Sequence, residues 1–102
     1  MKAVKELISD NCISLIRDAI SAAKGNEVFF LCSAEDGIVK SARPLARGND
    51  SMVPAIVQLA KFGDVVIHNH PTGALTPSSA DISVASSLAS SGIGFYIVSN
   101  AV

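Results

Sequence analysis

The sequence predicts an α/β (α+β) fold in which a mixed central sheet is flanked by helices. Two observations carry this prediction: a long N-terminal stretch repeats apolar residues at helical spacing, and short runs of strand-forming residues alternate with further helical segments. The expected order is helix, hairpin, helix, strand, helix, strand. Connections of this mixed kind fit a sheet with helices packed against it.

The N-terminal half is expected to form a helix followed by a hairpin. Apolar residues recur every three or four positions from Val4 to Ala23, which predicts one amphipathic helix over residues 3 to 24 that ends at Gly25. The run from Glu27 to Cys32 is short and rich in strand formers. Ala34–Gly37 has turn composition, so residues 38 to 45 are expected to return as the second strand of the hairpin.

The C-terminal half is expected to alternate helices and strands. A second helix is predicted after the loop at 46 to 50, with Pro54 in its first turn and Gly63 at its end. Residues 64 to 68 read as a strand and residues 71 to 77 as a loop. A helix over about Ser78 to Ser90 and a last strand over residues 95 to 98 complete the chain.

Composition points to one globular domain over residues 1–102. Apolar residues make up 49% of the chain and charged residues 17%, which argues against disorder. The formal net charge of −1 gives no electrostatic footprint for nucleic acid, so we expect no direct nucleic-acid binding by this domain. We expect no membrane span and a cytoplasmic location, with Cys12 and Cys32 as reduced, buried thiols.

Both histidines of the chain lie in the stretch HNHPTGALTPSSAD, residues 68 to 81. Alternate residues of a strand point to the same face, so His68 and His70 should project together and Asn69 away from them. Two imidazoles held in this way can bind one metal ion, and zinc is the usual occupant of mixed nitrogen and oxygen sites. Asp81, in the first turn of the next helix, could supply a carboxylate oxygen, leaving a fourth zinc position open for water.

The residues after the histidines also have a purely structural interpretation. Ser78 and Asp81 have the spacing of a helix capping box, and an aspartate in a first turn is favoured by the helix dipole. Thr76 followed by Pro77 is a competing helix start. Each of these residues alone therefore indicates little, whereas the whole combination is much rarer than its parts.

The combination resembles the signature of the JAMM (MPN-plus) zinc metalloprotease domain, in the form of its bacterial and RadC-like branch. The matching pattern is His-x-His-Pro-x-Gly followed by Pro-Ser-x-x-Asp, with both intervals as in the family. The resemblance implies a cytidine-deaminase-like three-layer arrangement and one zinc ion bound by His68, His70 and Asp81. It also implies that the Ser78 hydroxyl holds the reacting water or stabilises the tetrahedral oxyanion. Because the family domain usually continues past the last strand, the resemblance further implies that the chain could be an N-terminal fragment of a longer one.

The family signature includes an upstream glutamate, which maps to Glu27. The implied role of Glu27 is general base toward a zinc-bound water, followed by proton donation to the leaving amine. Glu35, which falls in a turn, and Glu6, on the polar side of the first helix, are the other candidates. The implied activity is zinc-dependent hydrolysis of a peptide or isopeptide bond, with the C-terminal tail of a ubiquitin-like or sulfur-carrier protein as the expected substrate.

A second hypothesis keeps the metal site but assigns little or no peptidase activity. RadC-like proteins share this motif and are associated with DNA repair, so the chain could be a repair-linked domain or a regulatory part of a helicase. Zinc deaminases are a third class, but they need a His-x-Glu and a Pro-Cys-x-x-Cys motif, and this sequence has neither.

Overall fold

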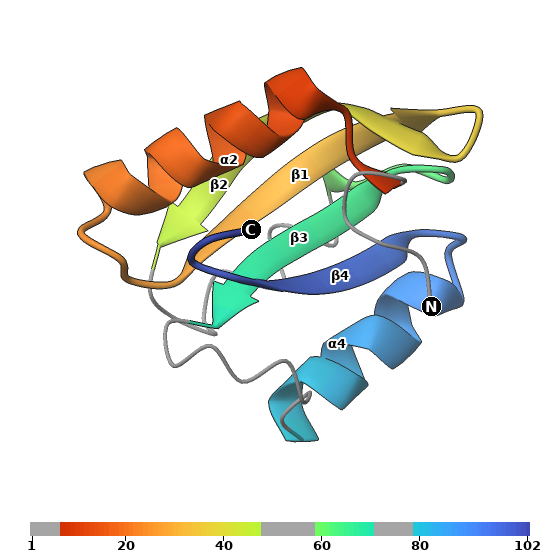
Figure 1. The fold of residues 1–102 in the computed structure, drawn as a ribbon. Helices are drawn as coiled ribbons and strands as arrows, with labels where there is room; N and C mark the ends of the chain where they lie inside the picture. Colours follow the sequence, from red (N-terminus) through yellow and green to blue (C-terminus); the bar gives the residue numbers. More distant parts are fainter. Residues whose placement is uncertain (1–6, 48–58, 71–78) are drawn as a thin grey trace.

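The computed structural model describes residues 7–47, 59–70 and 79–102. In this part of the chain it has the predicted α/β architecture, a mixed sheet with two helices packed against it (Figure 1). The elements are α2 (Asp10–Ala22), β1 (Val28–Glu35), β2 (Ile38–Arg47), β3 (Val65–His70), α4 (Ser79–Ala89) and β4 (Gly94–Ser99).

The four strands form one sheet in the order β2-β1-β3-β4. Strand β1 pairs antiparallel with both of its neighbours, whereas β3 and β4 run parallel and are joined through α4. A parallel pair needs a crossover connection of this kind, while an antiparallel pair can be joined by a tight turn. The start of β1 and the end of β3 therefore lie at the same end of the sheet (Figure 1).

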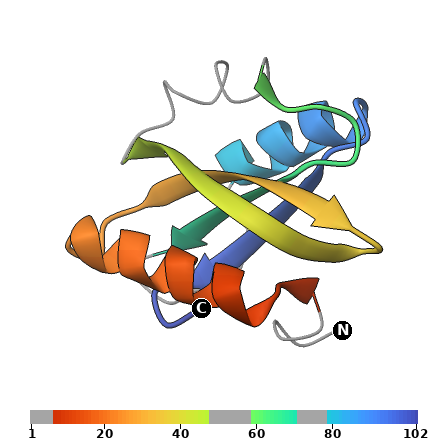
Figure 2. The same ribbon diagram turned by 90° about the horizontal axis from the view of Figure 1, so that it is seen from above.

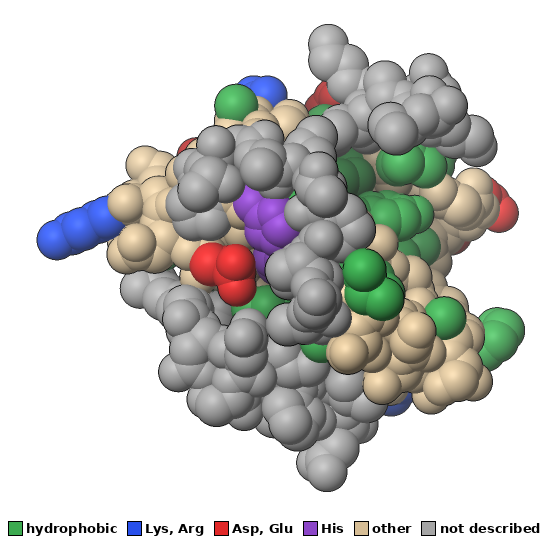
Figure 3. Space-filling model, turned by 90° about the horizontal axis from the view of Figure 1, so that it is seen from below, with side chains coloured by type: hydrophobic (Ala, Val, Ile, Leu, Met, Phe, Trp, Pro, Cys, Tyr) green, Lys and Arg blue, Asp and Glu red, His purple; other side chains and the backbone are tan. Residues whose placement is uncertain are grey.

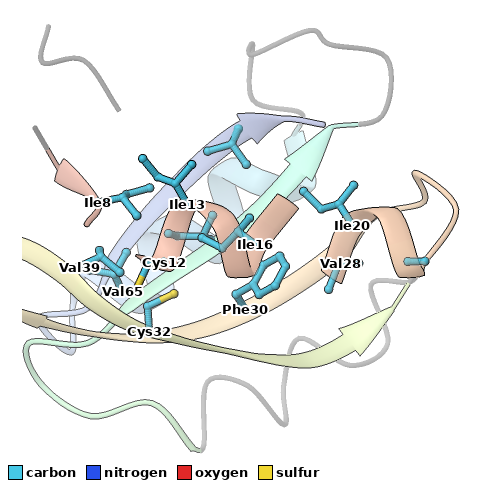
Figure 4. Close-up of a cluster of buried hydrophobic side chains, with 13 residues drawn as sticks. Ile8, Cys12, Ile13, Ile16, Ile20, Val28, Phe30, Cys32, Val39 and Val65 are labelled. Carbon is cyan, nitrogen blue, oxygen red and sulfur yellow. The ribbon is translucent and has the colours of Figure 1, made fainter. Parts of the chain in front are cut away.

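The two helices cover opposite faces of the sheet, which gives three layers (Figures 1 and 2). The face under α2 holds a core in which the isoleucines of that helix pack against Val28 and Phe30 (Figure 4). Ile67 of β3 belongs to the same core. The face under α4 holds a smaller core with Leu88 and Ile93 against the other side of the strands. Alternating residues of β1 and β3 serve the two cores in turn, as the period of a strand requires.

The predicted buried thiols lie in the core under α2. Cys12 and Cys32 are both free cysteines and both buried. Burial raises the pKa of the Cys32 thiol to about 12, with smaller contributions from Cys12 and Asp64. At neutral pH, Cys32 is therefore a protonated, apolar part of the core rather than a reactive thiolate.

The first helix begins later than the predicted 3 to 24, because α2 starts only at Asp10. Ser9 caps it, with its side-chain oxygen accepting from the Cys12 amide at 3.4 Å. Ile8 forms an isolated bridge to Val39, and the Ser9 amide donates to the Val39 carbonyl at 2.9 Å. The apolar spacing continues through Ile8 because that side chain is buried in the same core, although its backbone is paired with a strand.

The predicted hairpin is confirmed, with its turn at Asp36 and Gly37. Both residues have positive φ, 54° and 79°, which is the backbone of the two-residue turn that best matches the twist of paired strands. The later strands and α4 lie within two residues of their predicted bounds. The predicted helix before Gly63 falls almost entirely outside the described residues.

Neither of the two helices has the dimensions of a membrane span. Helix α2 has 13 residues and α4 has 11, whereas a helix that crosses a bilayer needs about 20. Within the described ranges, no helix is long and apolar enough to cross a membrane.

Candidate metal centre

The two histidines project from one face of β3, as the strand periodicity predicts. Strand β3 runs to His70, so both histidines belong to it, and their ring centroids lie 4.8 Å apart. Asn69 between them points to the opposite face, where it joins a separate set of hydrogen bonds. At the end of β3, the two imidazoles therefore point toward the α4 side of the sheet and the Asn69 amide points toward the α2 side.

His68 is fixed between aromatic rings. Its ring is stacked on Phe29 at a centroid distance of 4.7 Å and is tilted against Phe95 at 5.0 Å. The side chain is 0% exposed, whereas His70, one step further along the strand, is only partly buried. The site therefore has one imidazole held by packing and a second at the edge of the protein surface.

Glu27 lies opposite the histidines, immediately before β1. Phe29 is the cross-strand partner of His68, so continuing this antiparallel register by two residues places Glu27 opposite His70. Side chains directly opposite each other in a sheet share a face. One ligand atom from each of Glu27, His68 and His70 lies within 4.8 Å of the other two, so the three side chains form a candidate metal-binding group.

The surface view shows the same arrangement from outside. Histidine is visible beside an acidic side chain on the lower face of the molecule (Figure 3). Glu27 and His70 are both partly exposed. An ion, a water molecule or a substrate atom could therefore approach the group from solvent on this side.

The other predicted site residues are only partly described. Asp81 lies in the first turn of α4, as expected, but its side chain is outside the described part of the structure. Ser78 immediately precedes α4 and also lies outside the described residues. Of the alternative glutamates, Glu35 is exposed at the far end of β1, and Glu6 falls outside the described ranges.

The structure also assigns a function in the fold to Asn69, which the sequence indicated only as pointing away from the histidines. Asn69 is 0% exposed and contacts the segment on both sides of Glu27. A signal for this was present in the sequence, because asparagine is unfavourable inside a strand unless its amide has partners. Asn100, which completes the network, carries no comparable signal.

Comparison with protein families identifies the segment that contains the histidines. Residues 52–97 match the RadC-like JAB domain. Over these residues the chain is similar to that family. The matched segment includes His68, His70, Ser78 and Asp81, whereas Glu27 lies outside it and is brought to the histidines by the pairing of β1 with β3. A search of curated proteins found no match.

Proposed function

We propose that this chain is a metal-binding RadC-like JAB domain in which His68 and His70 hold one zinc ion, with Asp81 as the third ligand and Glu27 beside the ion. The observation that carries the proposal is the meeting of Glu27 with both histidines at one end of the sheet. The family match to residues 52–97 supports it independently, because it rests on sequence and not on this geometry.

The described residues fit a zinc ion. Two ligands at about 2.1 Å from one ion lie at most about 4.2 Å apart. One ring nitrogen of His68 and one of His70 lie within 4.8 Å of each other and of a Glu27 carboxylate oxygen, so a small side-chain rotation brings the two imidazoles within this limit, with Glu27 beside the ion. Two imidazoles with carboxylates form a donor set typical of zinc and unlike the all-oxygen sites of calcium or magnesium.

The carboxylate of Glu27 would act on protons rather than complete the ligand set. Bound zinc supplies water of lowered pKa, near 7 in catalytic sites. A carboxylate next to that water can accept its proton and later donate it to a leaving amine. His68 is already held by Phe29 and Phe95, so it would keep its position when an ion binds.

Two activities are compatible with such a site. The RadC-like family match supports a repair-linked or helicase-linked domain that binds metal with little or no peptidase activity. The position of Glu27 supports hydrolysis of a peptide or isopeptide bond, with the C-terminal tail of a ubiquitin-like or sulfur-carrier protein as the proposed substrate. Direct DNA binding is not part of either proposal, because the formal net charge is −1.

Metal analysis of protein purified without chelator tests the site. The wild type should carry about one zinc per chain, because the proposed site has three protein ligands and one open position, as catalytic zinc sites do. His68→Ala should carry almost none. Glu27→Gln should keep the zinc, because the amide replaces a proton acceptor and not a ligand. Equal zinc in the wild type and in folded His68→Ala would refute the proposed site.

Hydrolysis of a ubiquitin-like fusion protein then separates the two activities. Turnover by the wild type and its loss in Glu27→Gln, with zinc retained in both, would establish the hydrolase. Zinc binding without turnover in either protein would establish the metal-binding domain without peptidase activity.

A further inference from the structure

The segment before β1 is tied to β3 by one buried side-chain amide. The Val28 amide donates to Asn69 Oδ1 at 2.8 Å, and Asn69 Nδ2 donates to the Asn26 carbonyl oxygen at 3.2 Å. The orientation of the amide is fixed by its partners, because a backbone N–H can only donate and a backbone carbonyl can only accept. Asn69 thus contacts the residues on both sides of Glu27.

These two bonds hold the backbone of Glu27 itself. The Asn26 carbonyl belongs to the peptide group that precedes the Glu27 Cα, and the Val28 amide belongs to the peptide group that follows it. Since φ and ψ are the only soft backbone dihedrals of a residue, fixing both flanking peptide planes fixes the direction in which the Glu27 side chain leaves the backbone.

Asn100, immediately after β4, adds two further hydrogen bonds to this network. Asn69 Nδ2 also donates to Asn100 Oδ1 at 2.6 Å, and Asn100 Nδ2 donates to the Gly25 carbonyl at 3.0 Å. Gly25 has φ of +78°, and a Cβ at this position would lie 3.1 Å from Asn100 Nδ2. Glycine therefore serves both the backbone conformation and the close approach of the Asn100 amide.

We propose that Asn69 and Asn100 are positioning residues that hold Glu27 in place beside His68 and His70. The histidines leave β3 on either side of Asn69 and point to the opposite face, so one strand segment carries both histidines and, through Asn69, holds the backbone of Glu27. The proposal rests on the proposed function for its chemical meaning, because general-base chemistry requires a proton acceptor held within hydrogen-bond reach of the reacting water.

NMR of the metal-free protein tests this without reference to activity. In the wild type we expect NOEs between the Glu27 side chain and the His70 ring, and a rigid Glu27 backbone with an order parameter of about 0.85. In Asn69→Ala the NOEs should be lost and the Glu27 order parameter should fall toward about 0.6. Unchanged NOEs and an unchanged order parameter in folded Asn69→Ala would overturn the proposal, and so would their absence in the wild type.

Milder variants keep the test decisive if Asn69→Ala does not fold. Asn69→Asp keeps the acceptor for the Val28 amide but loses the donor to the Asn26 carbonyl, so it should weaken the NOEs without abolishing them. Asn100→Ala should weaken them, and Asn100→Asp, which keeps an acceptor for Asn69 Nδ2, should restore part of the loss. Wild-type NOEs in folded Asn69→Asp and Asn100→Ala would likewise reject the proposal.

Zinc content and a control variant separate this inference from the proposed metal site. The Asn69 and Asn100 variants leave the ligands in place and should still bind zinc. Ser9→Ala removes a helix cap and should leave the Glu27 NOEs intact, although its stability is lower. If the wild type binds no zinc, the metal site fails, while the NOEs still decide whether the two asparagines position Glu27.

Discussion

The buried polar side chains on the two faces of β3 have different surroundings. On the α2 side, Asn69 is fully buried and its amide bonds to the backbone and to Asn100. On the α4 side, His68 is equally buried but is surrounded by the rings of Phe29, Phe95 and His70. An amide with both ends bonded holds structure, whereas an imidazole packed beside a second imidazole and a carboxylate is arranged for binding. The difference predicts that substitutions on the α2 side change mainly stability, and that histidine substitutions on the α4 side change mainly metal affinity.

The largest effect on stability is expected for Phe30→Ala on the α2 side. Phe30 is 0% exposed in the larger core, and truncation of a buried phenylalanine costs about 3–5 kcal/mol. Urea unfolding measures the loss, and zinc affinity measured below the transition should stay near the wild-type value. A folded Phe30→Ala with much weaker zinc binding would break the division between the faces.

His70→Ala should show the reverse pattern. The side chain is partly exposed, so the free energy of unfolding of the metal-free protein should change by less than about 1 kcal/mol, as for most surface substitutions. Zinc affinity should fall by at least about 100-fold, since changes that only disturb a ligand's surroundings already cost about 10- to 100-fold. Competition with a chromophoric chelator measures the affinity, and a loss below tenfold would remove His70 from the ligand set.

Alkaline pH should lower the free energy of unfolding through Cys32, which lies in the core on the α2 side. Its pKa is about 12 in the folded protein against an ordinary value of 9.0, so between these values the unfolded state releases a proton that the folded state retains. Stability contributed by the protonated thiol is therefore complete below pH 9 and is lost as pH rises, by about 1.4 kcal/mol per pH unit. Urea unfolding from pH 8 to 11 measures the slope.

Cys32→Ala is the matched control for this titration. It removes the thiol, so the free energy of unfolding should fall less steeply with pH in this variant than in the wild type. Other groups that titrate in the same range are the same in both proteins. Equal slopes in the two proteins would show that burial does not hold the Cys32 proton.

Ser9→Ala should have the smallest effect and tests where α2 begins. Loss of a side-chain cap usually costs about 1 kcal/mol. The measured change in the free energy of unfolding should be of that size, and zinc affinity should not change. No loss of stability would favour a helix that continues through Ser9, as the apolar spacing alone predicts.

The sequence predicted those features that depend on local periodicity. The hairpin, the strand that carries both histidines and their shared face all follow from alternation and turn composition, and the structure confirms them. The same reasoning extended the first helix too far, because apolar spacing reports burial and Ile8 is buried while its backbone pairs with β2.

The features that depend on tertiary pairing were not accessible from spacing. Glu27 and His68 meet only because β1 and β3 pair antiparallel, and family resemblance, not composition, pointed to Glu27. Asn69 and Asn100 come together through the turn after β4, whose path local patterns do not specify. The network joins the segment before β1, the end of β3 and the turn after β4, so it depends on the tertiary arrangement of these three elements.

The strand order has a consequence for the dynamics of the candidate site. The histidines lie on β3 and Glu27 immediately precedes β1, and these are the two central strands of the sheet, with β2 and β4 outside them. Edge strands can open locally, but separation of the central pair requires much of the sheet to come apart, so opening there costs a large share of the global unfolding free energy. Amide hydrogen exchange in this pair should be among the slowest in the protein, and the groups that would hold the ion should stay together in nearly every molecule that is folded at all.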